Sequence, residues 1–207
     1  MIIPTMTEAE IVAELDKDYR NAFRYSDHVD KKFRRRVVKS SRFPVRMWHE
    51  YTSPRKNLWL LLFEARSKKE ILDDGRISLV CVFETAKGTF AAMGTFTGGK
   101  MHYVFYLPHF FSRYRSRFLQ SDVNTKDLIA RFFTENYSYV YGINEVKLDN
   151  NTVMKEVYGS TKEGVALGYV SAEGNVLFKT FITYEMLKGE QIAKFTENEK
   201  IRQEIHG

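Results

Sequence analysis

The sequence predicts an α+β fold with N-terminal helices, then an antiparallel sheet with an inserted helix, and a late β-hairpin. Apolar residues recur at helical spacing through residues 7–40. From residue 42 onward, short runs rich in β-branched and aromatic residues alternate with turn signals, as is typical of strands. Hydrophobic residues make up 43% of the 207-residue chain, which contains 12 Tyr and 16 Phe, so we expect a packed, sheet-rich body.

Two consecutive helices are expected in an N-terminal helical region, residues 1–41. The first covers residues 7–25 and begins with a capping box, because Thr7 and Glu10 can satisfy each other's exposed backbone N–H groups. Its core-facing arc consists of Ile11, Val12, Leu15, Tyr19, Ala22 and Phe23. The second covers residues 26–40 and has a thinner apolar stripe, made of Val29, Phe33 and Val37.

The remaining elements form an α+β body at residues 42–190, which divides, if at all, near residue 100. The expected strands are 43–52, 57–66, 77–85, 89–97, 101–106, 137–146, 152–158, 164–170 and 175–183. Further helices are expected at 108–119, 124–133 and 184–188. Turn signals such as Asp73-Asp-Gly75 and Gly98-Gly99 favour antiparallel pairing of consecutive strands. Residues 191–207 form a charged C-terminal tail, expected to add a peripheral helix.

The composition argues against several kinds of chemistry. The single cysteine, Cys81, cannot form an internal disulfide, and the five histidines lack metal-ligand spacing. No HExxH, GxSxG or phosphate-binding GK[ST] motif occurs, so we expect no metal and no cofactor. The N-terminus lacks a signal-peptide pattern, and the strongest apolar run, Trp59–Phe63, is too short to span a bilayer. A cytoplasmic protein without membrane contact is expected.

Positive charge is concentrated in one segment. Residues 31–56 contain ten Lys and Arg against one acid, a net charge of +9 in a chain whose total is +6. Such a local field favours RNA, another nucleic acid or a different polyanion as partner. The candidate contacts are Lys31, Lys32, Arg34, Arg35 and Arg36 on the second helix, followed by Arg42, Arg46 and Trp48, where aromatic and basic residues interleave. A solvated helix surface and ordinary packing of the aromatic residues explain the same pattern.

A second candidate is the helix at residues 108–119. Pro108 suits its first turn, and His109, Arg113 and Arg117 follow at i, i+4 and i+8 on one face, opposite an apolar face that includes Phe110 and Tyr114. A neutral imidazole beside guanidinium groups could act as a base toward an anionic substrate. The alternative is that the histidine caps or packs the start of the helix while the arginines are solvated.

The pattern H-x3-R-x3-R at the start of a helix, followed by a hairpin strand with Lys179-Thr-Phe-Ile-Thr183, resembles small bacterial ribonuclease toxins of the RelE and colicin type. The resemblance covers roughly residues 100–190 and implies RNA cleavage without a metal. It implies that His109 is the general base or acid. It also implies that Arg113, Arg117 and Lys179 stabilise the phosphate charge and that Thr180 or Thr183 binds a phosphate oxygen. Residues 1–99 have no counterpart in it.

Three functions therefore stay open at the level of sequence. The first is a metal-independent endoribonuclease-like protein, supported by the His/Arg helix and the late Lys-Thr strand. The second is a non-enzymatic, nucleic-acid-binding accessory protein, supported by the basic segment. The third is a structural or protein-interaction domain, in which the histidine is buried and the arginines are paired with carboxylates.

Overall fold

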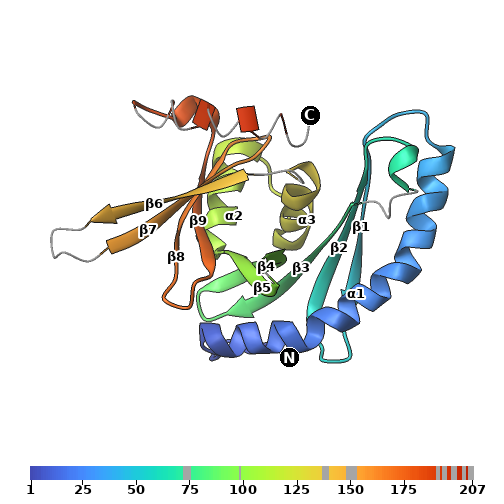
Figure 1. Cartoon of the computed structure of the whole chain (residues 1–207), viewed down its shortest axis with the longest axis horizontal. Helices are drawn as coiled ribbons and strands as arrows, with labels where there is room; N and C mark the ends of the chain where they lie inside the picture. Colours follow the sequence, from blue (N-terminus) through green and yellow to red (C-terminus); the bar gives the residue numbers. More distant parts are fainter. Residues whose placement is uncertain are drawn as a thin grey trace. The chain divides into compact units, whose positions relative to one another are not determined.

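The computed structural model describes residues 1–71, 76–97, 99–136, 140–147 and 153–189, together with residues 192, 195–196, 200–201 and 204. The expected Asp73–Gly75 turn, Gly98 and most of the predicted C-terminal tail lie outside the described residues. In the described part, a long N-terminal helix precedes nine strands and a few short helices (Figure 1). The predicted α+β class is confirmed.

The helices are α1 (Glu8–Lys39), α2 (Pro108–Tyr114) and α3 (Thr125–Glu135), with short turns η1 (Lys69–Ile71), η2 (Arg115–Leu119) and η3 (Tyr184–Met186). The strands are β1 (Val45–Thr52), β2 (Leu58–Ala65), β3 (Arg76–Thr85), β4 (Gly88–Thr97), β5 (Lys100–Tyr106), β6 (Val140–Lys147), β7 (Val153–Ser160), β8 (Val165–Val170) and β9 (Val176–Ile182). Their order is β1-β2-β3-β4-β5-β9-β8-β7-β6. The chain divides into two compact units, Met1–Tyr103 and Val104–Gly207.

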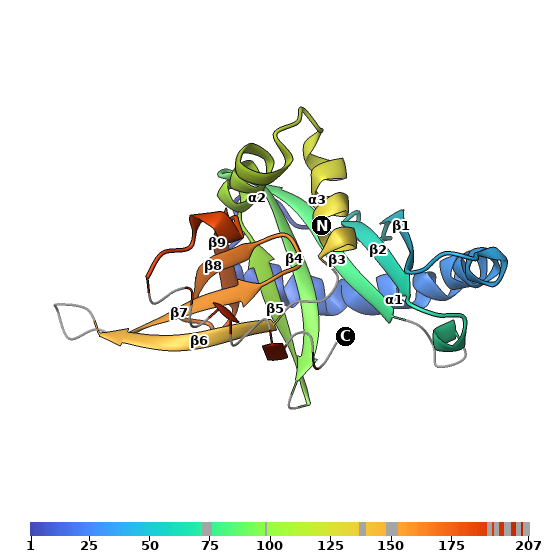
Figure 2. The same ribbon diagram turned by 90° about the horizontal axis from the view of Figure 1, so that it is seen from above.

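The sheet, expected to be antiparallel, is mixed, because one pair of strands that are not consecutive in sequence runs parallel. β5 and β9 run parallel, with Val104 opposite Val176 and Tyr106 opposite Phe178. Parallel neighbours require a crossover connection, and the chain supplies one, since α2, α3 and β6–β8 all lie between these strands in sequence. The other strand pairs with a described register are antiparallel, including β6 with β7, which extend together as a hairpin (Figure 2).

The two predicted N-terminal helices are one continuous helix of 32 residues, α1. The predicted capping box is confirmed: Thr7 N donates to Glu10 Oε2 at 2.8 Å and Glu10 N donates to Thr7 Oγ1 at 3.3 Å. The expected break at Ser26 is absent because this serine is buried and its hydroxyl donates to the Phe23 carbonyl within the helix, at 2.6 Å. The buried stripe therefore continues without interruption to Val37.

In the first unit, α1 packs against a strongly apolar strand. Residues 59–63 of β2 are all nearly inaccessible to solvent, in agreement with the strand predicted there. Side chains alternate along the strand, so Trp59 and Phe63 point to the same face. There the Trp59 indole bonds to Asp18 of α1, and the Phe63 ring lies 5.3 Å from that of Phe33. Both halves of α1 are thereby attached to β2.

Two carboxylates on the buried side of α1 form a polar network with the β1–β2 hairpin. Asp18 is fully buried and accepts hydrogen bonds from Ser53 Oγ (2.6 Å), Asn57 Nδ2 (2.8 Å) and Trp59 Nε1 (2.9 Å). Burial by itself raises the pKa of this carboxyl group, but the hydrogen bonds outweigh it and the pKa is lowered. Glu14 receives two hydrogen bonds from Arg55, at 2.5 and 2.8 Å.

The second unit is built around aromatic rings that α2 and α3 place against β9. Phe178 and Phe181, both fully buried on β9, each contact Phe110 of α2, with ring centroids 6.5 and 5.9 Å apart. Tyr106 and Phe132 join the same cluster from β5 and α3. Edge-to-face pairs predominate, the arrangement in which the positive ring edge meets a negative ring face.

Replacing Asp18 by Ala should lower the free energy of unfolding by about 3–5 kcal/mol, because it leaves buried donors of Ser53, Asn57 and Trp59 without their acceptor. Chemical denaturation followed by Trp fluorescence measures the change. The matched control is Asp27→Ala on the exposed side of the same helix, which should change stability by about 0.5 kcal/mol or less. Equal effects of the two substitutions would contradict the role given to Asp18.

Glu14 should make the stability of the protein depend on acid pH. The Arg55 guanidinium lowers the pKa of Glu14 from 4.5 to about 2, against the opposing effect of burial. A carboxyl group with a lowered pKa stabilises the fold above its unfolded-state pKa. This contribution is therefore lost as the pH falls from 4.5 to about 2. Denaturation curves should show a shallower decline for Glu14→Gln than for the wild type, whereas the exposed Glu84→Gln should follow the wild type.

Candidate nucleic-acid interface

The last nine residues of α1 present a row of exposed cations. Residues 31–39 contain six Lys and Arg and no acid. Val29, Phe33 and Val37 are buried and fix which side of the helix faces the sheet. The exposed cations are Lys31, Lys32, Arg35, Arg36 and Lys39. Among the described residues none of these five takes part in a hydrogen bond or ion pair, so their charges are available to an anion.

Two of the predicted contacts, Arg34 and Arg46, are instead engaged within the protein. Arg34 pairs with Asp30 one turn earlier in α1, and its Nη1 donates to the Ile71 carbonyl of η1 at 2.5 Å. Arg46 Nε lies 2.7 Å from Oε2 of Glu64, and only 2% of Glu64 is exposed to solvent. A charge buried to this extent needs its partner. Both arginines therefore stabilise the fold, which the charge pattern alone did not reveal.

Arg42 and Trp48, the other predicted contacts, lie after the end of α1. Arg42 is exposed, and its backbone is held by the Ser40 hydroxyl, which donates to the Arg42 carbonyl at 2.7 Å. Trp48 is half-buried on β1. Because side chains alternate along a strand, Trp48 points to the face of β1 opposite to His49. Arg42 is thus accessible, while Trp48 does not join the ring cluster on the α1 side.

The sequence prediction missed that ring cluster, which we call the α1–β1 aromatic cluster: Tyr25 and His28 of α1 with His49 and Tyr51 of β1. The rings of Tyr25 and Tyr51 are stacked, with centroids 4.0 Å apart and planes 11° apart. His49 is stacked on Tyr25 at 6.0 Å, and His28 meets it edge-on at 5.9 Å. Burial raises the pKa of Tyr51, so its phenol adds no negative charge here. The available signal in the sequence was the two-residue spacing of His49 and Tyr51, which places both rings on the same face of a strand.

The aromatic cluster and some of the cations share one flank of α1. Tyr25, His28, Lys32 and Arg36 follow one another at i, i+3, i+7 and i+11, the spacing of a single stripe on an α-helix. Contacts of Tyr25 with His49 and Tyr51 show that this flank faces β1. Positive charges and partly exposed rings therefore lie beside each other on the surface of the first unit.

In the second unit, the predicted His/Arg helix forms but is not a regular α-helix throughout. Pro108 occupies its first turn as expected, and the last five residues form a π-helical turn, η2. His109 is exposed and its Nε2 accepts a hydrogen bond from Arg113 Nε at 3.1 Å. Arg117 lies in η2, where its Nη1 donates to the Phe181 carbonyl of β9 at 2.7 Å. His109 and Arg113 therefore lie in contact, whereas Arg117 is bonded to the backbone of β9.

The two candidate residues on β9, Lys179 and Thr180, lie at a β-bulge. Thr180 pairs with Leu167 of β8 and Phe178 pairs with Gly168, so Lys179 is an extra residue in β9. The bulge requires Gly168, since a Cβ there would lie 1.9 Å from the Leu177 carbonyl oxygen. Phe181 packs against α2, so by alternation Thr180 points to the opposite face. Lys179 is exposed, and Thr180 does not converge with His109.

The sequence prediction also missed a polar network around Glu163, in the β7–β8 connection. Its carboxylate accepts hydrogen bonds from Arg131 (2.9 and 3.1 Å), from the Tyr114 hydroxyl (2.5 Å) and from Asn136 Nδ2 (2.8 Å). The Arg131 guanidinium also lies 5.7 Å from the centre of the Tyr114 ring. These contacts fix α2 and α3 to the sheet of the second unit. The guanidinium of Arg115, at the start of η2, donates from Nη2 to Thr125 Oγ1 at 3.4 Å.

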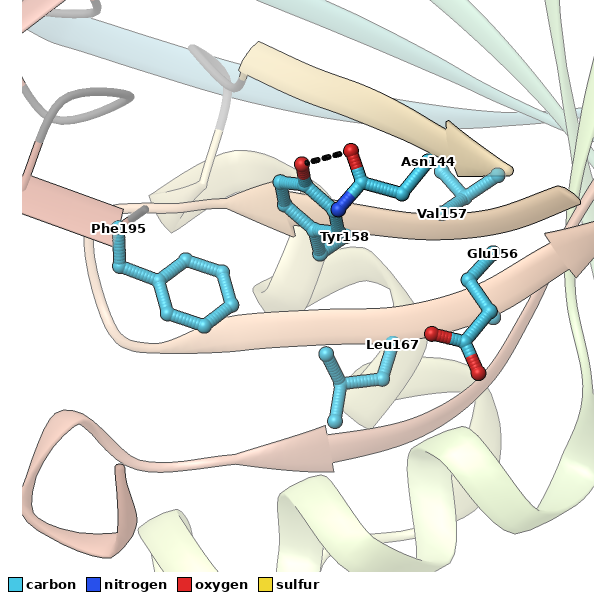
Figure 3. A pocket seen from close by; sticks show the side chains of 7 residues that line it. Asn144, Glu156, Val157, Tyr158, Leu167 and Phe195 are labelled. Atoms are coloured by element: carbon cyan, nitrogen blue, oxygen red, sulfur yellow. Dashed lines mark hydrogen bonds between the residues drawn. The ribbon is translucent and has the colours of Figure 1, made fainter. Parts of the chain in front are cut away.

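A small cavity of about 270 Å³ lies on β6, β7 and β8 (Figure 3). It is lined by Asn144, Glu156, Val157, Tyr158, Leu167, Gly168 and Phe195. The Tyr158 hydroxyl donates to Asn144 Oδ1 at 2.8 Å, and the Tyr158 ring meets that of Phe195 edge-on at 5.6 Å. The Tyr158 hydroxyl and the Asn144 carbonyl oxygen are therefore occupied with each other. None of the residues selected from the sequence lines it.

Three further findings bear on function. Within the described ranges, no group of three or more His, Cys, Asp or Glu side chains is arranged to hold a metal ion. No helix in the described part of the chain has the length and apolar character needed to cross a membrane. Comparison of the chain with family models, characterised proteins and solved structures found no match. The functional interpretation therefore depends on the geometry of the residues themselves.

Proposed function

We propose that the protein binds nucleic acid through the phosphate backbone, with the exposed cations of α1 as the contact surface. The observation that supports this proposal most directly is the row of five exposed Lys and Arg side chains within residues 31–39, none of which is paired with another residue of the described part of the chain. A rigid helix holds these charges at fixed separations, and no acid in that stretch neutralises them. Cations arranged in this way displace the counterions condensed on a polyanion, which gives affinity without reading base sequence.

Charge reversal on α1 tests the proposal. The variant Lys31→Glu/Arg35→Glu changes two residues that lie one turn apart on the outer face of α1. Each phosphate contact that is lost should reduce the magnitude of the slope of log K against log salt concentration by about one. We expect the slope of the double variant, measured by fluorescence anisotropy with a labelled oligonucleotide, to fall by about two. The control, Lys87→Glu/Lys100→Glu, makes the same change in net charge at exposed positions outside α1.

The two outcomes are distinct. If the salt slope of the control variant falls as far as that of the α1 variant, binding reflects only total charge and α1 is not the contact surface. If the wild type binds no RNA or DNA even at low ionic strength, the proposal fails and the structural or protein-interaction reading takes its place.

A second candidate function is metal-independent RNA cleavage at His109. It is favoured by one observation: this exposed imidazole accepts a hydrogen bond from Arg113 at 3.1 Å, so a cation stands beside it. The resemblance to ribonuclease toxins assigns the general base or acid to this residue. Arg117 and Thr180 contribute less to such a site than the resemblance implies, because their described contacts direct them elsewhere.

His109→Ala should lower RNA cleavage by roughly 10²-fold or more, because a general base contributes 10²–10⁴-fold to the rate. Cleavage of a labelled RNA in the presence of EDTA measures the effect. His102→Ala, which removes an exposed imidazole from β5, is the matched control and should leave cleavage unchanged. Undiminished cleavage by a folded His109→Ala protein would exclude the mechanism.

A further inference from the structure

The α1–β1 aromatic cluster has a composition that simple packing does not require. Two of its four rings are tyrosines and two are imidazoles, and none of them is fully buried. Tyr25 and Tyr51 stack face to face at 4.0 Å, so the stacked pair has ring surface at the border of the protein. Rings in this position can stack further with a flat, unsaturated ligand.

Cations stand in line with these rings along the helix. Lys32 and Arg36 continue the stripe that begins with Tyr25 and His28, and Lys32 lies one turn beyond His28. At 1.5 Å per residue, the distance along the axis from Tyr25 to Lys32 is roughly 10 Å. Both cations are exposed and have no described partner. The flank therefore offers ring surface and positive charge within the length of a short oligonucleotide.

We infer that this flank binds single-stranded nucleic acid, with unpaired bases stacked on the Tyr25–Tyr51 rings and the adjoining phosphates held by Lys32 and Arg36. The inference rests on the proposed function, since it names the class of nucleic acid that the α1 surface takes. A duplex offers only its phosphates to such a flank, because its base faces are already stacked on one another. A single strand offers both phosphates and base faces, and aromatic residues beside a cationic groove are the usual means of binding one.

The sequence-independent nature of stacking sets the expected specificity. Every base has a flat face, so the flank should accept all four bases with small differences. The ligand class is thus defined by strandedness rather than by sequence.

The test separates stacking from charge. Tyr25→Leu keeps an apolar side chain of moderate size but removes the ring, whereas Tyr25→Phe keeps the ring. Binding of a labelled 12-nucleotide single strand and of a 12-base-pair duplex is measured by anisotropy at equal ionic strength. We expect Tyr25→Leu to weaken single-strand binding roughly ten-fold and to leave duplex binding unchanged. Tyr25→Phe should retain wild-type values, and Lys32→Glu/Arg36→Glu should weaken both.

Each remaining outcome decides between the inference and the function on which it rests. Circular dichroism establishes that the leucine variant is folded; if it is not, the wild-type preference for single strand over duplex becomes the measurement. Equal single-strand affinity of folded Tyr25→Leu and wild type, or a wild-type preference for duplex, overturns the inference and leaves nucleic-acid binding intact. Binding to vesicles containing anionic phospholipid, with no binding to either oligonucleotide, overturns both.

Discussion

The buried carboxylate of Asp18 is the contact on which the first unit depends. It lies on the inner side of α1 and accepts hydrogen bonds from the turn after β1 and from the beginning of β2. A buried charge is tolerated only where its hydrogen bonds are complete. The hydrogen bonds of Asp18 therefore fix both the rotation of α1 about its axis and its position along that axis relative to the strands. Glu14, one turn earlier, repeats the constraint through Arg55. The outward direction of the cations on the same helix follows from that rotation.

Charge is also segregated along α1. Glu8 and Glu10 lie in the first turn, and Arg36 and Lys39 in the last, as the helix dipole favours at each end. The cations of the last nine residues nevertheless repel one another, and among them Arg34 is paired with Asp30. A bound polyanion would relieve the repulsion among the rest. The physical argument for an anionic partner therefore comes from the protein's own electrostatics as well as from the count of its charges.

The elements that the sequence predicted well are those whose signal is local. The capping box at Thr7, the apolar strand at residues 59–63 and the proline at the start of α2 depend only on near neighbours. The features that were missed depend on distant ones. Ser26 looks like a helix start until its burial is known, and the parallel pairing of β5 with β9 joins segments about seventy residues apart.

The same distinction applies to the candidate site. The charge of residues 31–39 is plain in the sequence, but the withdrawal of Arg34 and Arg46 into ion pairs depends on Asp30 and on the buried Glu64. The stacking of Tyr25 on Tyr51 depends on how α1 crosses β1, which no periodicity specifies. Around His109, the row of arginines follows helical spacing only up to the point where η2 widens the turn.

The bulge in β9 gives the strand a change of register in its middle. Phe178 and Phe181, three residues apart, would point to opposite faces of a regular strand, yet both contact Phe110 because Lys179 is passed over in the pairing. At position 179 the bulge therefore depends on the presence of one extra residue and not on the chemistry of its side chain. Many side chains fit there, and a chain that lacked the residue would pair as a regular strand in which the two phenylalanines, then two residues apart, still share a face. A relative of this chain is therefore compatible with the same pairing of β8 and β9 at a spacing of either three or two residues between these phenylalanines.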